Sequence, residues 1–162
     1  MIINPSLPSG FVTFCDDIRH EVTGKMTLVG VYGGQMIVGG TLPITLPQIC
    51  AVITFRFLPP TEPIKPVIKI FMSGQDDLLF MMETDITPTQ AATAVAEVAR
   101  AEVDPDRVSF AQIVITPQIQ GLVIREAGTL KVRAYIGEDE IRLGTLSIMI
   151  ASDQSIDLSV PA

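Results

Sequence analysis

The chain has 162 residues, of which 48% are hydrophobic and 18% charged, a composition that favours one folded domain and excludes an intrinsically disordered chain. Its 11 basic and 18 acidic residues give a formal net charge of -7. Because the basic residues are scattered singly along the sequence, we expect no nucleic-acid partner, and the acidic balance disfavours an anionic membrane surface.

Residues 1–9 read as an N-terminal extension without the basic and apolar regions of a secretory signal, and Pro5 and Pro8 interrupt it. We therefore expect a cytoplasmic protein. Cys15 and Cys50 could form a disulfide, but in that compartment they are expected to stay reduced and to pack as small hydrophobic residues.

Short β-rich runs separated by turn residues predict eight or nine strands between residues 10 and 150. The first runs from Gly10 to Ile18. The runs Lys25–Tyr32 and Gln35–Val38 are expected to form a hairpin around the turn Gly33–Gly34, and the next strand to begin at Pro47.

The segment from Met26 to Phe55 contains no charged residue. Glycines and prolines interrupt it every few residues, so it does not predict a membrane span. We expect short strands that are buried on both faces, either inside the domain or against another subunit.

Within Ile49–Leu58 the odd-numbered residues form one fully apolar face, as a strand that borders a core requires. The proline-rich segment Pro59–Pro66 is expected to be a connection, because proline lacks a backbone donor. The runs Val67–Ser73 and Leu78–Glu83 then predict a hairpin.

A capping box with proline at the first helical position begins at Thr87 and predicts a helix over about 88–101. We expect this helix to pack across the end of the sandwich. The run Arg107–Ile119, which Pro117 interrupts, is typical of an edge strand.

Strict alternation in Thr129–Ile136 predicts a terminal hairpin with Ile141–Ile150, in which Lys131, Arg133 and Tyr135 face outward. A polar C-terminal tail follows over 151–162. The elements together predict an all-β fold, an antiparallel β-sandwich of about eight or nine strands over residues 10–150 with one short helical insertion.

The densest polar group is CDDIRHE, Cys15 to Glu21. Strand alternation places Cys15, Asp17 and Arg19 on one side and Asp16, Ile18 and His20 on the other. One interpretation is a strand end whose carboxylates bind backbone NH groups or arginine side chains. The alternative is a small-ligand or enzyme site, in which His20 or an aspartate transfers protons.

Tyr32, on the adjacent predicted strand, completes that candidate ligand site, whose members are Asp16, Asp17, Arg19, His20 and Tyr32. No catalytic residue is assigned, and the protein is expected to be a non-enzyme. The glycines match neither a phosphate-binding loop nor a dinucleotide fingerprint, and no nucleophile elbow occurs, so no cofactor is predicted.

Carboxylates in predicted loops leave a calcium-dependent binding module as a further alternative. They lie at Asp76–Asp77, at Asp104 and Asp106, and at Glu138–Glu140. No EF-hand loop is present, and no metal site is assigned.

The segments FVTFCDDIRHE, KMTLVGVYGGQMIV and LPQICAVITFRF, and later GTLKVRAYIGEDEIRLGTL, carry a resemblance. The chain is similar to a family of small uncharacterised bacterial and phage proteins that share a CDDIR segment followed by K-x-x-L-x-G-x-Y. The resemblance implies a shared β-rich fold and no particular chemistry.

Depletion of charge is the feature that points furthest toward function. The centres of protein interfaces are poor in Lys, Glu and Asp, and a long uncharged segment is hard to bury inside one small sandwich. We therefore expect a cytoplasmic binding or assembly module that associates with itself or with another protein.

Overall fold

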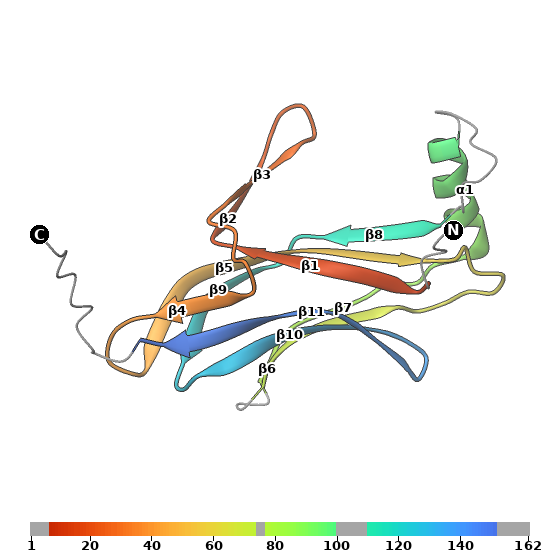
Figure 1. The fold of residues 1–162 in the computed structure, drawn as a ribbon. Helices are drawn as coiled ribbons and strands as arrows, with labels where there is room; N and C mark the ends of the chain where they lie inside the picture. Colours follow the sequence, from red (N-terminus) through yellow and green to blue (C-terminus); the bar gives the residue numbers. More distant parts are fainter. Residues whose placement is uncertain (1–6, 74–76, 100–109, 152–162) are drawn as a thin grey trace, which may run out of the picture.

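Two β-sheets face each other across an apolar core, and a two-stranded hairpin and a helix project from one side (Figure 1). The computed structural model describes residues 7–73, 77–99 and 110–151. The all-β sandwich with one short helix that the sequence predicts is confirmed. The described residues form eleven strands rather than eight or nine.

The four-stranded sheet is built around β5 (Ile44–Phe57). β1 (Ser9–Cys15) pairs with the second half of β5 along one edge. The other edge is shared between β8 (Ala111–Ile115), which pairs with the second half, and β9 (Gln118–Ile124), which pairs with the first half. All these pairings are antiparallel.

The five-stranded sheet has the order β4 (Gln35–Val38), β11 (Asp139–Ile150), β10 (Gly128–Ile136), β6 (Val67–Ser73) and β7 (Asp77–Glu83). Its pairings are antiparallel except that between β11 and β4, which is parallel. The hairpins β6–β7 and β10–β11 confirm the two pairings that local alternation predicts.

The core consists of the inward faces of both sheets, and several of its side chains are completely buried. Among them are Ile53 and Phe55 from β5 and Ile70, Leu130 and Leu146 from the five-stranded sheet. The face of β5 that contacts this core changes at Pro47. Before Pro47 the even-numbered residues Ile44 and Leu46 contact the core, and after it the odd-numbered residues Ile49, Ala51 and Ile53 do. Pro47 lies opposite Gly121 of β9, where the β5–β9 pairing is interrupted.

The two sheets also meet along one flank, where β1 lies against β11. At this contact Gly144 faces Val12, and a Cβ atom on Gly144 would lie 2.6 Å from the Val12 Cγ1 atom. Its φ of +147° is also one that other residues rarely adopt. A glycine therefore permits the close approach of the two strands.

The helix α1 (Pro88–Ala99) lies at one end of the sandwich, and Ala91 is buried in the core (Figure 1). The predicted capping box is confirmed: the Thr87 backbone NH donates to Gln90 Oε1 at 2.9 Å, and the Gln90 NH donates to Thr87 Oγ1 at 3.3 Å. Residues 100 and 101 of the predicted helix lie outside the described residues.

Several predicted strand boundaries are wrong. The strand from Gly10 to Ile18 is divided at Asp16, because the chain turns away from β5 there. Pro47 lies inside β5 instead of opening it. The hairpin around Gly33–Gly34 does not form, because residues 26–29 pair with residues 17–20 and β4 pairs with the distant β11.

The predicted edge strand Arg107–Ile119 is also two strands, β8 and β9, with Pro117 between them. Residues 107–109 and the predicted tail from residue 152 lie outside the described residues, as do residues 1–6 of the predicted N-terminal extension. Within the part of the chain that the structure describes, no helix has the length and hydropathy needed to span a bilayer.

Candidate functional site

A two-stranded hairpin projects from the four-stranded sheet and is the most distinctive feature of the molecule (Figure 1). It consists of β2 (Asp17–His20) and β3 (Met26–Val29), and we call residues 17–29 the arm. The turn is closed by backbone hydrogen bonds from the Glu21 NH to the Lys25 carbonyl and from the Gly24 NH to the Glu21 carbonyl, both 2.9 Å.

The two ends of the arm meet at Asp16. The Asp16 backbone NH donates to the Val29 carbonyl at 2.9 Å, which brings the outgoing and returning chains together. The returning chain passes Asp16 at Gly30, whose φ is +66°. A Cβ atom at Gly30 would overlap the Asp16 carboxylate, so this close passage requires glycine.

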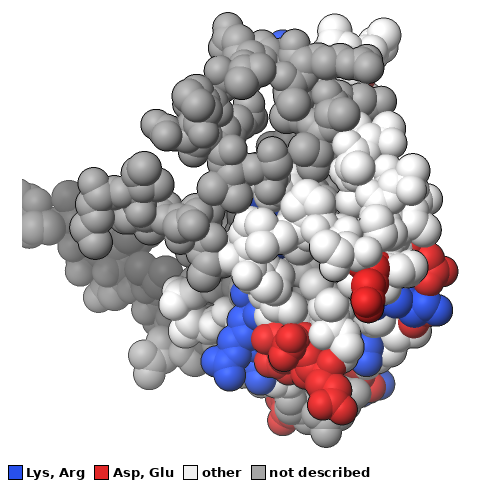
Figure 2. Space-filling model, turned by 90° about the vertical axis from the view of Figure 1, so that its right-hand side faces the viewer, with Lys and Arg blue, Asp and Glu red and all other residues white. Residues whose placement is uncertain are grey.

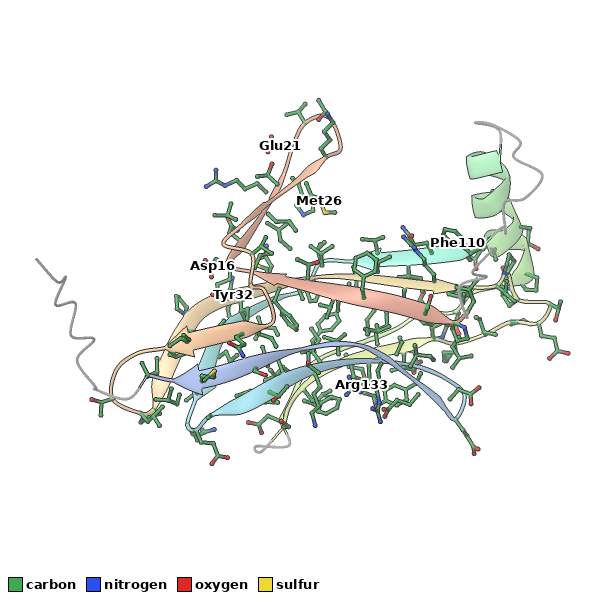
Figure 3. All side chains as sticks on the ribbon, viewed as in Figure 1. Asp16, Glu21, Met26, Tyr32, Phe110 and Arg133 are labelled. Atoms are coloured by element: carbon green, nitrogen blue, oxygen red, sulfur yellow. The ribbon has the colours of Figure 1, made fainter. Side chains whose placement is uncertain are left out.

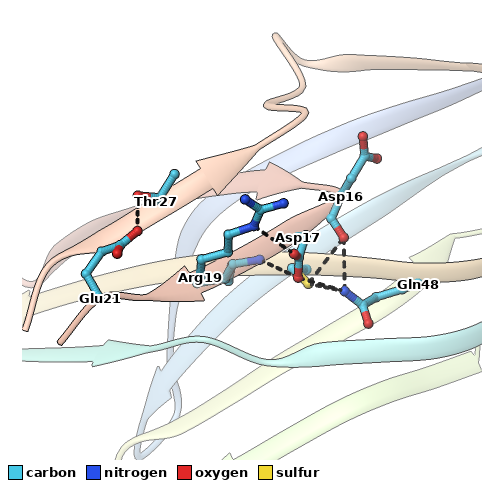
Figure 4. A network of polar contacts seen from close by, with 8 residues as sticks. Asp16, Asp17, Arg19, Glu21, Thr27 and Gln48 are labelled. Atoms are coloured by element: carbon cyan, nitrogen blue, oxygen red, sulfur yellow. Dashed lines mark hydrogen bonds and ion pairs between the residues drawn. The ribbon is translucent and has the colours of Figure 1, made fainter.

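Gln48 of β5 fastens the base of the arm through its side-chain amide (Figure 4). Its Nε2 atom donates to the Asp16 carbonyl at 3.1 Å and lies 3.4 Å from Asp17 Oδ1. Asp17 Oδ1 also accepts a hydrogen bond from the Ile18 backbone NH at 2.9 Å, and its Oδ2 lies 3.7 Å from Arg19 Nε. These contacts join β2 to the central strand of the sheet.

Tyr32 holds the returning chain. Its backbone NH donates to the Phe14 carbonyl at 2.9 Å, and its hydroxyl donates to Asp16 Oδ1 (Figure 3). Burial, together with the hydrogen bond to the Asp16 carboxylate, raises the pKa of Tyr32 to about 12. The phenol therefore stays protonated and remains a hydrogen-bond donor over the physiological pH range.

A second, small apolar cluster lies beneath the arm, on the outer face of the four-stranded sheet. Ile18 of β2 packs with Cys15, Cys50 and Val52 of the sheet, and Leu28 of β3 packs against them. Cys15 and Cys50 are 0% and 1% exposed, and both thiols are free. Burial is the largest cause that raises the pKa of each thiol above its ordinary value.

The rest of the arm surface is exposed and contains apolar residues. Val22 at the turn, Met26 and Val29 on β3, and Val31 just beyond it are all more than a third exposed. Within the domain, the uncharged segment 26–55 is therefore buried over the second half of β5, whereas β3 of the arm is mostly exposed. Burial of the arm against another subunit stays a prediction.

The five predicted site residues do not form one site in the structure. Four of them form two separate pairs, and the fifth contacts neither pair. Asp16 meets Tyr32, and Asp17 meets Arg19, while His20 lies exposed at the end of β2. Sequence reasoning missed Gln48, which contacts both aspartates from a strand that lies 31 residues further along the chain. The ligand-binding role of these residues stays a prediction.

A hollow of about 350 Å³ lies elsewhere, between β7 and β9, and is lined by residues that include Asp77, Leu79, Gly121 and Arg125. Across the described ranges, no three His, Cys, Asp or Glu side chains are grouped so that they could hold a metal ion. Of the predicted calcium-binding loops, Asp76, Asp104 and Asp106 lie outside the described residues.

Sequence reasoning also missed a row of cations on the outer face of the five-stranded sheet. Lys69, Arg133 and Arg142 lie directly opposite one another on β6, β10 and β11. Glu140 Oε1 lies 3.4 Å from Arg133 Nε and 3.8 Å from Arg142 Nε. Arg133 lies on the outer face as predicted, but only 9% of it is exposed.

Comparison with known proteins identifies a family but assigns no function. None of the curated proteins matches the chain. The model of a family of unknown function, DUF6941, matches residues 10–149, which include both sheets, the arm and the helix. The chain therefore belongs to this family of unknown function.

Proposed function

We propose that this protein is a non-enzymatic assembly module that binds further copies of itself through the arm. The observation that supports this proposal is the exposed apolar surface of the arm, which is attached to the sandwich only at its base. Val22, Met26 and Val29 lie exposed along a projecting hairpin whose inward side chains, Ile18 and Leu28, already cover the sheet.

Two further exposed apolar side chains lie on the same face of the four-stranded sheet as the arm. Phe11 of β1 and Val114 of β8 flank Thr54 of β5 in register, and they are 49% and 44% exposed. Arg56 lies beside them, with its guanidinium 5.8 Å from the Phe11 ring centre and 5.2 Å from that of Phe110. This surface is suited to an interface, because the centres of protein–protein interfaces are rich in aromatic residues and arginine and poor in carboxylates.

The charge distribution supports the same proposal. Seen from the end that carries α1, the charged side chains of the described residues lie mainly toward the five-stranded sheet, and the described residues directly above them are mostly uncharged (Figure 2). An isolated two-stranded hairpin is marginally stable in water, so a partner that covers the arm would also stabilise it. We further propose that the module acts in the cytoplasm of a bacterium or of a phage-infected cell.

The test is the concentration dependence of the molar mass, measured by light scattering and sedimentation. We expect the wild-type chain to associate, and the variant with both Met26→Asp and Val29→Asp to associate at least about tenfold more weakly, because charge at an interface core remains unpaired. Met81→Asp is the matched control, because Met81 is 55% exposed but lies on β7 of the five-stranded sheet.

A wild-type chain that remains monomeric up to millimolar concentration contradicts the proposal. Equal weakening by Met81→Asp and by the arm variant also contradicts it, because the effect would then not be specific to the arm.

A further inference from the structure

The two cysteines of the chain lie directly opposite each other on neighbouring strands. Cys15 ends β1, and its partner in the antiparallel register is Cys50 of β5. They are 35 residues apart in the sequence and are the only cysteines present. The fold therefore pairs every thiol of the protein at one position, beneath the arm.

The backbone hydrogen bonds around this pair define its spacing. The Phe14 carbonyl accepts from the Tyr32 NH, and the Ala51 NH donates to the Pro117 carbonyl at 3.0 Å, so both groups point away from the ladder between β1 and β5. Hydrogen-bonded and non-hydrogen-bonded pairs alternate along an antiparallel ladder. Cys15 and Cys50 are therefore a hydrogen-bonded pair, whose Cα atoms lie about 5.5 Å apart, within the range that disulfides span. Their Cβ atoms are also about 5.5 Å apart in such a pair, so closure requires the end of β1 to shift toward β5 by about 1 Å.

The arm controls access to both sulfur atoms. Ile18 and Leu28 pack against the pair, and the thiols have almost no exposed surface. The Cys50 Sγ also lies 3.6 Å from the Asp16 carbonyl, to which it can donate, and accepts a hydrogen bond from Gln48 Nε2 at 3.3 Å. Any reagent in solution therefore reaches the sulfurs only when the arm lifts from the sheet.

We propose that Cys15 and Cys50 form a redox site, which a small disulfide such as oxidised glutathione closes into an intrachain disulfide when the arm lifts. The Cys50 thiol loses its proton to water, and its sulfur attacks one sulfur of the small disulfide, which releases one thiol. The Cys15 thiol then loses its proton, and its sulfur attacks the mixed disulfide and releases the second thiol. The protein gives up two electrons, and the small disulfide gains them.

Gln48 assists the first step because its amide donates to the Cys50 sulfur and stabilises the thiolate there. The resulting bond would join β1 to β5 covalently at the position where the arm leaves the sheet. This redox site does not require self-association, so the outcome of its test is independent of the proposed assembly function.

The test treats the reduced full-length chain with oxidised glutathione and follows intact mass and peptide maps. We expect the mass to fall by two hydrogen atoms and a cross-linked peptide that contains Cys15 and Cys50 to appear, and this conversion to be reversed by a reducing thiol. Cys15→Ser is expected to stop at the mixed disulfide with glutathione on Cys50.

A pair of destabilised variants tests the role of the arm. We expect Ile18→Ala to accelerate closure by about tenfold or more, because loss of this buried side chain favours local opening of the arm. Leu130→Ala is the control, since Leu130 is completely buried in the main core and its loss should destabilise the sandwich without this acceleration.

Two results overturn the inference. One is stable glutathione adducts on both cysteines of the wild-type chain without a cross-link, which would show that the sulfurs cannot meet. The other is equal acceleration by both alanine variants, which would show that the thiols react only after global unfolding.

Discussion

Asp16 is the residue on which the geometry of the arm depends most. Its backbone NH, its carbonyl and its carboxylate each bind a different partner, namely Val29, Gln48 and Tyr32. Carboxylates at strand ends commonly bind nearby backbone and side-chain donors, and this was one of the two sequence interpretations. The contacts of Asp16 and Asp17 agree with that interpretation.

Tyr32 makes stability depend on pH in the alkaline range. Its pKa is near 10 in the unfolded chain and about 12 in the folded one, so the stability it contributes is fully present below pH 10. Above pH 10 the unfolded chain releases the proton first. The free energy of unfolding is therefore expected to fall between pH 10 and pH 12.

Denaturant unfolding of wild type and Tyr32→Phe over this pH range measures the effect. The variant is expected to lose about 1 kcal/mol at neutral pH, from the missing hydrogen bond, and to show a smaller decline above pH 10. Burial also raises the pKa of Tyr135, the other tyrosine, so some decline should persist in both proteins. An identical decline in the two proteins would contradict the assignment to Tyr32.

At the scale of elements, the arm shows where local sequence patterns predict structure and where they do not. Alternation places Asp17 and Arg19 on one side of a strand, and their ion pair agrees with this. It is wrong in placing Cys15 and Ile18 on opposite sides, because the chain turns at Asp16 and Ile18 packs against Cys15. The turn Gly33–Gly34 has the sequence of a hairpin turn, but the observed turn spans residues 21–25. The pairing of β4 with β11 joins segments more than 100 residues apart, and no local pattern specifies such a partner.

A substitution at Gly30 tests how the chain returns from the arm to the sheet. Gly30→Ala is expected to cost about 2 kcal/mol or more, because alanine disfavours the left-handed backbone conformation and its methyl group would overlap Asp16. Amide hydrogen exchange should accelerate over residues 17–29. Gly33→Ala is the control, because no atom lies within 4 Å of a Cβ at Gly33, and equal acceleration in both variants would refute this explanation.

At the scale of the whole molecule, the sequence predicts the sandwich well and its surface poorly. The β6–β7 and β10–β11 hairpins and the helix start follow from alternation and from a capping box, which are local signals. The row of Lys69, Arg133 and Arg142 could not be predicted because its members are scattered singly in sequence and become neighbours only through strand register. The same applies to Gln48 and to the opposed cysteines.

Gly144 tests how the two sheets are held together. A methyl group there would collide with Val12 across the contact between β1 and β11 and force the strands apart. We expect Gly144→Ala to lower the global free energy of unfolding by about 2 kcal/mol or more, measured by thermal and denaturant unfolding. Gly39→Ala, where no atom lies within 4 Å, should change it little, and an unchanged Gly144→Ala protein would contradict the close contact.

The hydrogen bond between Asp16 and Val29 has an implication for how this fold can vary. Because the arm leaves and re-enters the sheet at adjacent points, its strands form a cassette that can be lengthened, shortened or exchanged without moving β1 or β5. Proteins built on the same sandwich can thus present arms of different length and surface by altering about a dozen contiguous residues.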